Sequence, residues 1–370
     1  MKKRIKILTF NGVYKPGYKG GGPVKSIANM AEALFREFDF YIIASDRDFG
    51  DSKPYENIKV NEWNQLDFEK VFYHSGESVT IKRLLSIIKS IDYDIAYLQG
   101  YFSNYTRKYL LLSKLKLIKK KPVILCPRGD FSEGKSNSFW KKVKKWIYIA
   151  VLKTLGFNKN IIWHATSSIE KEDIIKKIGK KAIIVEAPNI PTKPKHKFKT
   201  IKKEPGKLNL VYISRINRKK NLLTAIKLLN NLKGRIIFSI YGPIFDNSYW
   251  EECKKEIQKL PNNIKVQYMG SLDSRLVGDV LGENHFLLFP TNGENFGHII
   301  YESLCSGCPV IISNNTPWKN LSEFNVGWDI PLTELSIFQN KLQECIDMTN
   351  EQYLKMRENS YRYAKKWYLN

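Results

Sequence analysis

The sequence predicts an α/β protein with two doubly wound domains, each built around a parallel sheet. Short β-branched or aromatic runs alternate with longer stretches of helical periodicity, which is the rhythm of strand–helix–strand units. This alternation lapses once, near the middle of the chain, and then restarts. The 370 residues also match the combined length of two typical domains.

The N-terminal domain is expected to span residues 1–190. Six short runs of strand-forming residues follow one another there, at 5–10, 40–44, 95–98, 122–126, 161–165 and 182–186. Apolar residues at helical spacing predict a helix around 26–34 and another around 169–178. Ser167 or Ser168 is the expected N-cap of the second helix.

A linker is expected at residues 191–207, where prolines, Gly206 and lysines replace the regular pattern. The second domain then covers residues 208–350. Its expected strands are 208–214, 236–241, 264–270, 286–290 and 310–313, and its expected helices are about 222–232, 249–260 and 298–306. Residues 351–370 are helical in character, and their sequence allows packing on either domain, including a return to the N-terminal one.

The composition is strongly basic. There are 61 Lys and Arg against 36 Asp and Glu, a net charge of +25, which predicts attraction to a nucleic acid, a membrane leaflet or a phosphorylated substrate. Five sparsely spread cysteines, without metal-like spacing, indicate a reduced cytoplasmic protein with no metal site. The basic start leads into a short strand rather than a signal peptide, and we expect no membrane-spanning segment.

Two cations follow the first strand of the second domain, Arg215 and, five residues later, Lys220. A planar guanidinium fork and a compact ammonium on a strand-to-helix loop suit a diphosphate. On this segment alone, a solvated basic loop is the competing interpretation.

A second loop in the same domain follows the buried strand 286–290. It brings Glu294 to the carboxyl end of the strand, and backbone N–H groups of residues 295–297 can point at a phosphate where the next helix begins. Glu302 lies within that helix. A carboxylate in an apolar stretch needs hydrogen-bond donors, and sugar or ribose hydroxyls can supply them.

These two segments carry a resemblance to a known family. The run Gly293–Glu302, GENFGHIIYE, with SGCPVI shortly after it, and the earlier SRINRKK at 214–220, resemble the E-x7-E and R-x4-K motifs of glycosyltransferase family 4, the "group 1" enzymes. The likeness extends along nearly the whole chain, through a glycine-rich first loop at 20–22 and a Pro-Arg-Gly loop at 127–129, although these N-terminal motifs are less specific.

The resemblance implies a GT-B fold, in which two Rossmann-like domains face each other across a cleft. It implies a retaining transferase that needs no cofactor or metal besides its nucleotide-sugar donor. The implied catalytic residues are Arg215 and Lys220, which hold the diphosphate as it leaves, and Glu294, which lies beside the donor sugar. The implied donor-binding residues are Asn295, Phe296 and Gly297, which line the sugar and phosphates, and Glu302, which binds the ribose. No nucleophile is assigned.

Some positions depart from the family pattern. Ser214 and Asn221 stand where glycines are common. Arg128 stands where many relatives carry a histidine that faces the donor sugar, so either Arg128 contacts the sugar or phosphate, or the donor differs. Gly21 and Gly22 allow backbone to approach a diphosphate or an acceptor closely, with a simple turn as the alternative.

Much of the positive charge falls in residues 107–153, with 14 Lys and Arg, two acids and a net charge of +12. Within it, residues 138–152 place lysines beside Trp140, Trp146 and Tyr148 at helical spacing. This pattern is typical of a helix that lies on an anionic membrane, although an ordinary amphipathic helix fits too. Because many relatives use lipid-linked acceptors, we expect a peripheral protein at the inner face of the membrane.

The function expected from the sequence is transfer of a sugar from a nucleotide-sugar to an acceptor, which is a saccharide or is linked to polyprenyl diphosphate, in the synthesis of capsule, O-antigen or exopolysaccharide. A sugar-nucleotide epimerase of related fold is the main alternative. A catalytically silent relative is disfavoured because all four charged motif residues are present. Nucleic-acid binding rests on net charge alone, without a recognisable binding motif, so no nucleic-acid partner is expected.

Overall fold

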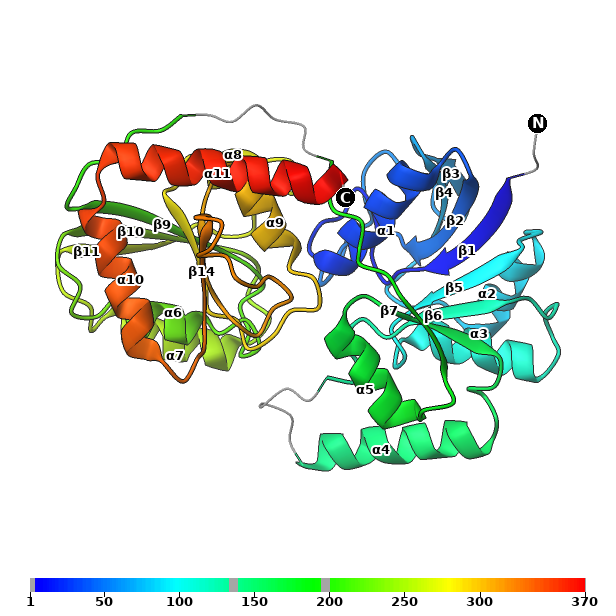
Figure 1. The fold of residues 1–370 in the computed structure, drawn as a ribbon. Coiled ribbons are helices and arrows are strands. Elements are labelled where there is room, and N and C mark those ends of the chain that lie inside the picture. Colours follow the sequence, from blue (N-terminus) through cyan, green and yellow to red (C-terminus); the bar gives the residue numbers. More distant parts are fainter. Residues whose placement is uncertain (1–3, 133–138, 194–199, 370) are drawn as a thin grey trace. The chain divides into compact units, whose positions relative to one another are not determined.

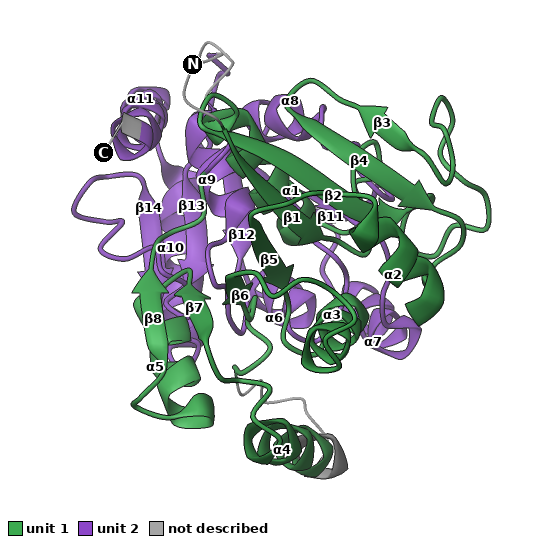
Figure 2. Cartoon of the chain, turned by 90° about the vertical axis from the view of Figure 1, so that its right-hand side faces the viewer, with its two compact units in different colours: residues 1–133, 137–190 green, residues 134–136, 191–370 purple. Residues whose placement is uncertain are grey.

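The structure is a computed structural model that describes residues 4–132, 139–193 and 200–369, without the side chains of residues 139–142 and 369. The chain forms two compact units (Figure 2). Unit 1 ends at Ile190 and unit 2 begins at Pro191. Each unit is a sheet flanked by helices.

The sheet of unit 1 has eight strands in the described chain, in the order β3-β4-β2-β1-β5-β6-β7-β8. Only the pairing of β3 with β4 is antiparallel. The strands are β1 (Ile5–Phe10), β2 (Phe38–Ser45), β3 (Trp63–Gln65), β4 (Glu69–His74), β5 (Ile95–Gln99), β6 (Val123–Cys126), β7 (Ile161–Ala165) and β8 (Ile183–Glu186). The strand order reverses between β1 and β5, where doubly wound sheets bind ligands.

The helices of unit 1 are α1 (Gly22–Leu34), α2 (Ile81–Lys89), α3 (Asn104–Lys114), α4 (Phe139–Thr154) and α5 (Ser168–Ile178) (Figure 1). Local capping defines where two of them start. The hydroxyl of Thr80 accepts the N–H of Arg83 at 3.2 Å before α2, and Ser167 accepts the N–H of Glu170 at 3.2 Å before α5. The sequence predicted either Ser167 or Ser168 as the N-cap of this helix, and the structure shows that it is Ser167.

The sheet of unit 2 has six described strands, all parallel, in the order β11-β10-β9-β12-β13-β14. They are β9 (Lys207–Ile213), β10 (Arg235–Tyr241), β11 (Ile264–Tyr268), β12 (Phe286–Phe289), β13 (Val310–Ser313) and β14 (Gly327–Ile330). Numbered within the unit, this is the order 3-2-1-4-5-6 of a nucleotide-binding sheet. Its reversal point lies between β9 and β12.

The helices of unit 2 are α6 (Leu222–Leu228), α7 (Asn247–Ile257), α8 (Val277–Gly282), α9 (His298–Cys305), α10 (Leu335–Asp347) and α11 (Asn350–Leu369). The C-terminal helix α11 packs against α9 of the same unit. The Trp367 ring of α11 lies 5.7 Å from the ring of Tyr301 in α9. Of the two packings that the sequence allowed for residues 351–370, the structure shows the contact within unit 2.

Part of the expected linker belongs to unit 2. Lys203 is 1% exposed, and its ammonium donates to the carbonyl oxygens of Glu204 and Ile346, each at 2.9 Å. Ile346 is in the last turn of α10, where free carbonyl groups attract a cation. The chain is therefore anchored to unit 2 before β9 begins.

The predicted fold class, two parallel-sheet α/β domains, is confirmed. The sequence did not indicate β3, β4 and β14. β4 begins with Glu69 and Lys70, and β14 contains a glycine and an aspartate, so strand pairing rather than local propensity decides their conformation. Among the described helices, none combines the length and the apolar composition needed to cross a membrane.

Candidate active site

Two loops meet at the reversal point of the unit 2 sheet. Residues 214–221 follow β9, and residues 290–297 follow β12, which pairs with β9. Asn292 ties the loops together: its backbone N–H donates to the carbonyl of Lys219 at 2.9 Å, and its side-chain amide donates to the carbonyl of Arg218 at 2.9 Å. The motif residues are therefore held in one place by bonds between the loops.

Lys220 and Glu294 form an ion pair across these loops, with each side chain only 13% exposed. The backbone of Lys220 is fixed on both sides, because its N–H donates to the side-chain oxygen of Asn217 at 3.1 Å and its carbonyl accepts the Tyr212 hydroxyl at 3.1 Å. The N–H of Glu294 donates to the carbonyl of Asn315 at 3.0 Å. Burial lowers the pKa of Lys220, and the nearby Glu294 carboxylate partly offsets this effect.

Arg215 belongs to the same group of charges. Its guanidinium lies over the Phe245 ring at 5.2 Å. Burial lowers the pKa of Arg215, while the negative charge of Glu294 raises it. Two cations and one carboxylate thus occupy a partly desolvated site at the carboxyl end of the sheet. Such a site attracts an anion more strongly than the same charges would in water.

Asn221 explains one departure from the family pattern. It is the N-cap of α6 in the left-handed conformation, with φ 59°, which asparagine tolerates better than most residues with a side chain. Its amide nitrogen donates to the carbonyl of Pro290 at 2.8 Å. An asparagine therefore adopts the conformation that a glycine would adopt and adds a bond between the two loops.

The start of α9 is the third part of this site. Gly297 is its N-cap, with φ 80°, and the first N–H groups of a helix have no partner within the helix. The Phe296 ring is 5% exposed and packs on Trp318 and Trp367 at centroid distances of 5.8 and 5.6 Å. The Trp318 indole N–H donates to the Phe296 carbonyl at 2.5 Å. The ring of Phe296 is therefore part of the core of unit 2, and its carbonyl already accepts a hydrogen bond.

Glu302 lies within α9, and its side chain is half-buried, as is that of Asn295 in the preceding loop. The structure thus gathers Arg215, Lys220 and Glu294 into one charged group and places the other donor-binding candidates of unit 2 at the start of α9 and along it. Cys305 and Cys308, which flank the end of this helix, are free thiols.

In unit 1, the glycine-rich loop leads into α1. Gly21 is the N-cap of α1, with φ 68°, and Gly22 is its first residue. The carboxylate of Asp48 holds this loop from the segment after β2, accepting the backbone N–H groups of Tyr18 at 2.7 Å and of Lys19 at 3.0 Å. Sequence reasoning did not identify Asp48, which is 4% exposed.

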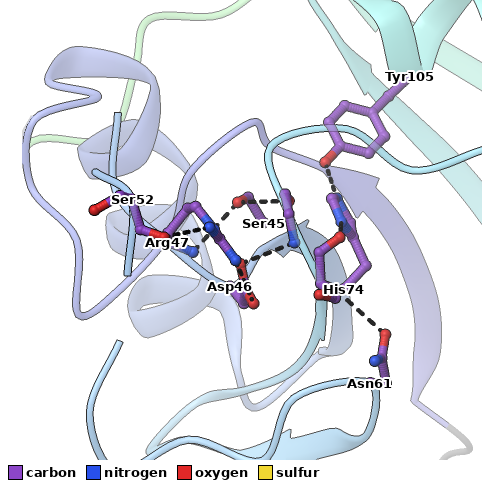
Figure 3. Close-up of polar contacts among 9 residues, drawn as sticks. Ser45, Asp46, Arg47, Ser52, Asn61, His74 and Tyr105 are labelled. Atoms are coloured by element: carbon purple, nitrogen blue, oxygen red, sulfur yellow. Dashed lines mark hydrogen bonds and ion pairs between the residues drawn. The ribbon is translucent and has the colours of Figure 1, made fainter. Parts of the chain in front are cut away.

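Asp48 is next to a buried polar network at the ends of β2 and β4, which sequence reasoning also missed. Asp46 accepts the Arg47 side chain at 2.8 Å (Figure 3) and the N–H of Gly76 at 3.1 Å. His74 contacts the Tyr105 hydroxyl at 2.5 Å, and burial lowers its pKa. The only sequence signal is the Asp-Arg-Asp triplet at 46–48, one residue beyond the expected strand 40–44. The network fixes the segment that carries Asp48.

Arg128 follows β6 in unit 1 and has φ 56°. Its guanidinium donates to the Gln99 side chain at 2.7 Å, to the Tyr97 hydroxyl at 3.3 Å and to the Asn189 side chain. Tyr97 in turn contacts Nδ1 of His164 at 2.7 Å. Arg128 is thus held rigidly by neutral partners at the carboxyl end of β5 and β6.

Comparisons with known proteins agree with this geometry. Residues 193–367 match the family model described as glycosyl transferases group 1. A curated relative, described as an uncharacterized 41.2 kDa protein in the cps region of Klebsiella pneumoniae, is 27% identical over 258 residues, which is 66% of this chain and 68% of that protein.

Solved structures resemble both units together. Anabaena HepE, in complex with UDP and glucose, has a TM-score of 0.67 and 15% identity, with 98% of this chain and 95% of that chain covered. WaaG, a glycosyltransferase involved in lipopolysaccharide biosynthesis, has a TM-score of 0.64 and 12% identity, with 97% and 95% covered. Unit 2 thus resembles the group 1 glycosyl transferases, whose family model it matches over nearly its whole length, and the two units together have the GT-B fold of these solved structures.

Proposed function

We propose that this protein is a retaining glycosyltransferase that moves a sugar from a nucleotide-sugar to a saccharide acceptor. The observation that carries the proposal is the grouping of Arg215, Lys220 and Glu294 at the reversal point of the unit 2 sheet. The complex of HepE with UDP and glucose supports a nucleotide-sugar as the donor.

The chemistry follows from the charges. Breaking the bond between sugar and diphosphate builds negative charge on the leaving group, and preorganised cations stabilise that charge most in the transition state. Arg215 and Lys220 would take this role without a metal ion. In the proposal, Glu294 and Asn295 meet donor hydroxyls, Gly297 and the N–H of Phe296 meet the phosphates, and Glu302 binds the ribose. In unit 1, Gly21, Gly22 and Arg128 are the proposed donor-binding residues.

The acceptor in this proposal is a growing surface polysaccharide linked to polyprenyl diphosphate. The Klebsiella relative from a cps region and the lipopolysaccharide enzyme WaaG support such a pathway. Within α4, Ile147 and Val151 are spaced four residues apart and are 49% and 47% exposed, and Trp146 is 69% exposed. Exposed apolar residues beside lysines suit the surface of an anionic leaflet. We therefore place the protein at the inner face of the membrane.

The donor is tested by a thermal-shift panel of UDP-, GDP-, ADP- and TDP-sugars, because a ligand of the folded state raises its melting temperature. We expect the nucleotide-sugars of one base to raise the melting temperature, and Lys220→Ala should abolish this increase. No shift with any of the four would contradict the proposal. The product of the reaction decides between the two enzyme classes: an epimerase converts the nucleotide-sugar without an acceptor, whereas a transferase releases nucleoside diphosphate.

Membrane association is tested by sedimentation with anionic vesicles. The variant is Lys144→Ser with Trp146→Ser. It leaves out three residues of the sequence pattern whose side chains the structure does not describe: Trp140, Lys141 and Lys142. The control is Lys82→Ser with Arg83→Ser on α2, two exposed basic residues of the same unit. Weaker binding of the first variant alone is expected. Equal binding of both variants and the wild type would remove the membrane assignment.

A further inference from the structure

A pocket in unit 1 has no role in the site described above. It lies between α4, α5 and the loops that follow β5 and β6, and its volume is about 490 Å³. Helices α4 and α5 contact each other beside it (Figure 1). The volume is within the range of roughly 300–1,000 Å³ that is usual for sites of small ligands.

The floor of the pocket is apolar. Phe131 is 3% exposed and Ile149 8% exposed, and both belong to the core of unit 1. Phe102 packs against Phe131 at 6.2 Å, while Ala150 leaves space on the α4 side. Trp146 is at the mouth and is 69% exposed, so the apolar floor continues onto the exposed surface of α4. A chain of hydrocarbon could enter here and be removed from water.

The rim of the pocket is basic. Its charged residues are Lys145, Lys153, Lys176, Lys177 and Asp130, which leaves a net charge of +3. The carboxylate of Asp130 accepts the N–H of Phe102 at 3.0 Å, and the ammonium of Lys145 donates to the Asp130 carbonyl at 3.2 Å. The single acid therefore holds the loops in place, and the lysines give the mouth its charge.

The pocket is next to a residue of the candidate donor site. Asp130, Phe131 and Ser132 line the pocket, and Arg128 is only two residues before them in the loop after β6. A molecule with an apolar tail in the pocket would therefore have its charged end close to the carboxyl end of the unit 1 sheet. The pocket therefore suits an amphiphile with a strongly anionic head, because its floor is apolar, its rim is cationic and it lies near the carboxyl end of the sheet.

We propose that this pocket binds the lipid part of the acceptor: the first isoprenoid units occupy the apolar floor, and the diphosphate contacts the lysines of the rim. This inference rests on the proposed function, in which the acceptor is linked to polyprenyl diphosphate. In this proposal, α4 and α5 bind a single lipid molecule in the pocket. Such binding differs from the general attraction of α4 to an anionic membrane surface.

The test uses farnesyl diphosphate as a soluble probe and the fluorescence of tryptophan, including Trp146 at the pocket mouth, as the signal. Every titration is made in the Lys220→Ala background, so that a diphosphate bound in unit 2 does not contribute. We expect saturable 1:1 binding. Inorganic pyrophosphate and farnesol, which each lack one half of the ligand, should bind at least tenfold more weakly.

Two variants address the two halves of the pocket. Ala150→Phe fills the apolar space, and Lys153→Glu with Lys176→Glu reverses two charges at the rim; each should weaken farnesyl diphosphate binding at least tenfold. Ala150→Leu serves the same purpose if the larger side chain prevents folding. The control is Lys82→Glu with Lys89→Glu on α2, two exposed lysines of the same unit, which changes the net charge equally and should leave binding unchanged.

Unchanged binding in both pocket variants would overturn the proposal, as would pyrophosphate binding as tightly as farnesyl diphosphate. Pocket variants that lose affinity for anionic vesicles but keep farnesyl diphosphate binding would assign the pocket to bilayer lipid and overturn it too. The thermal-shift panel of nucleotide-sugars measures donor binding independently of the lipid probe. Probe binding at the pocket without any donor shift would refute the proposed function alone, and a donor shift without probe binding would refute the lipid pocket alone.

Discussion

The ammonium of Lys220 contacts the carboxylate of Glu294, and the two residues stand on loops that follow neighbouring strands, β9 and β12. The cation proposed to hold the diphosphate is therefore kept in position by the carboxylate proposed to meet the sugar. Because both side chains are 13% exposed, neither is well solvated without the other. In the proposed function, this ion pair links the part of the site that binds phosphate to the part that binds the sugar.

Removal of this cation should reduce turnover strongly. We expect Lys220→Ala to lower kcat/KM by roughly 10²–10³-fold, as for the loss of one preorganised electrostatic contact in an active site. Sugar transfer or donor hydrolysis is the measurement, with circular dichroism to show that the fold persists. The control is Lys219→Ala, since the exposed neighbour contributes its backbone carbonyl, and not its ammonium, to the loop contacts. Equal effects of the two substitutions would contradict the assignment.

Glu294 should set the pH range of diphosphate binding. Burial lowers the pKa of Lys220 below its ordinary value, and the carboxylate of Glu294 acts in the opposite direction. Binding of a diphosphate needs the protonated ammonium, so affinity should fall as pH rises through the pKa of Lys220 in the folded protein. Glu294→Gln removes the offset, and the fall should move to lower pH. UDP titrations across pH 7–11 would measure it, and a fall at unchanged or higher pH would count against the coupling.

Asn221 should contribute to stability through its backbone and its side chain together. Asn221→Ala places an alanine at φ 59°, removes the bond to the Pro290 carbonyl, and removes the amide oxygen that accepts the Thr224 hydroxyl at 2.9 Å. We expect a loss of about 1–3 kcal/mol in the free energy of unfolding, and less for Asn221→Gly, since glycine adopts this conformation freely. Urea denaturation measures both. The exposed Asn231, with φ 68°, gives the matched control, because Asn231→Ala reports the backbone cost by itself. A cost at Asn221 no larger than at Asn231 would show that the side-chain bonds with Pro290 and Thr224 add nothing.

The sequence was sufficient to predict the fold class and the charged group, for a physical reason. Arg215, Lys220 and Glu294 follow strands with clear apolar patterns, and neighbouring parallel strands present their loops at one edge. The contact between Lys220 and Glu294 was not predictable in this way. It depends on bonds that the loops make with each other and with Asn315, which lies 21 residues beyond Glu294.

Two other features depended on partners far away in the sequence. The motif that contains Phe296 predicts a ligand-lining residue, but its ring is buried by Trp318 and by Trp367 of the last helix. Asp48 was missed because its partners, the backbone N–H groups of Tyr18 and Lys19, lie 30 and 29 residues earlier in the chain. In both cases the role of the residue is decided by tertiary packing, which local pattern does not contain.

Asp48 should determine the position of the glycine-rich loop. It is 4% exposed and accepts two backbone N–H groups of that loop, and charge-assisted bonds of this kind contribute more than neutral ones. We expect Asp48→Ala to speed hydrogen exchange at residues 17–22 and to lower turnover roughly tenfold or more, because a catalytic loop displaced by about 1 Å loses activity. Asp48→Asn, which keeps an acceptor oxygen, should be intermediate. Asp51 is the control: its carboxylate is 42% exposed and pairs with the Lys19 side chain, so Asp51→Ala should change stability by about 0–1 kcal/mol. If Asp51→Ala affected exchange in the loop as much as Asp48→Ala, the order of the loop would depend on surface charge and not on the buried carboxylate.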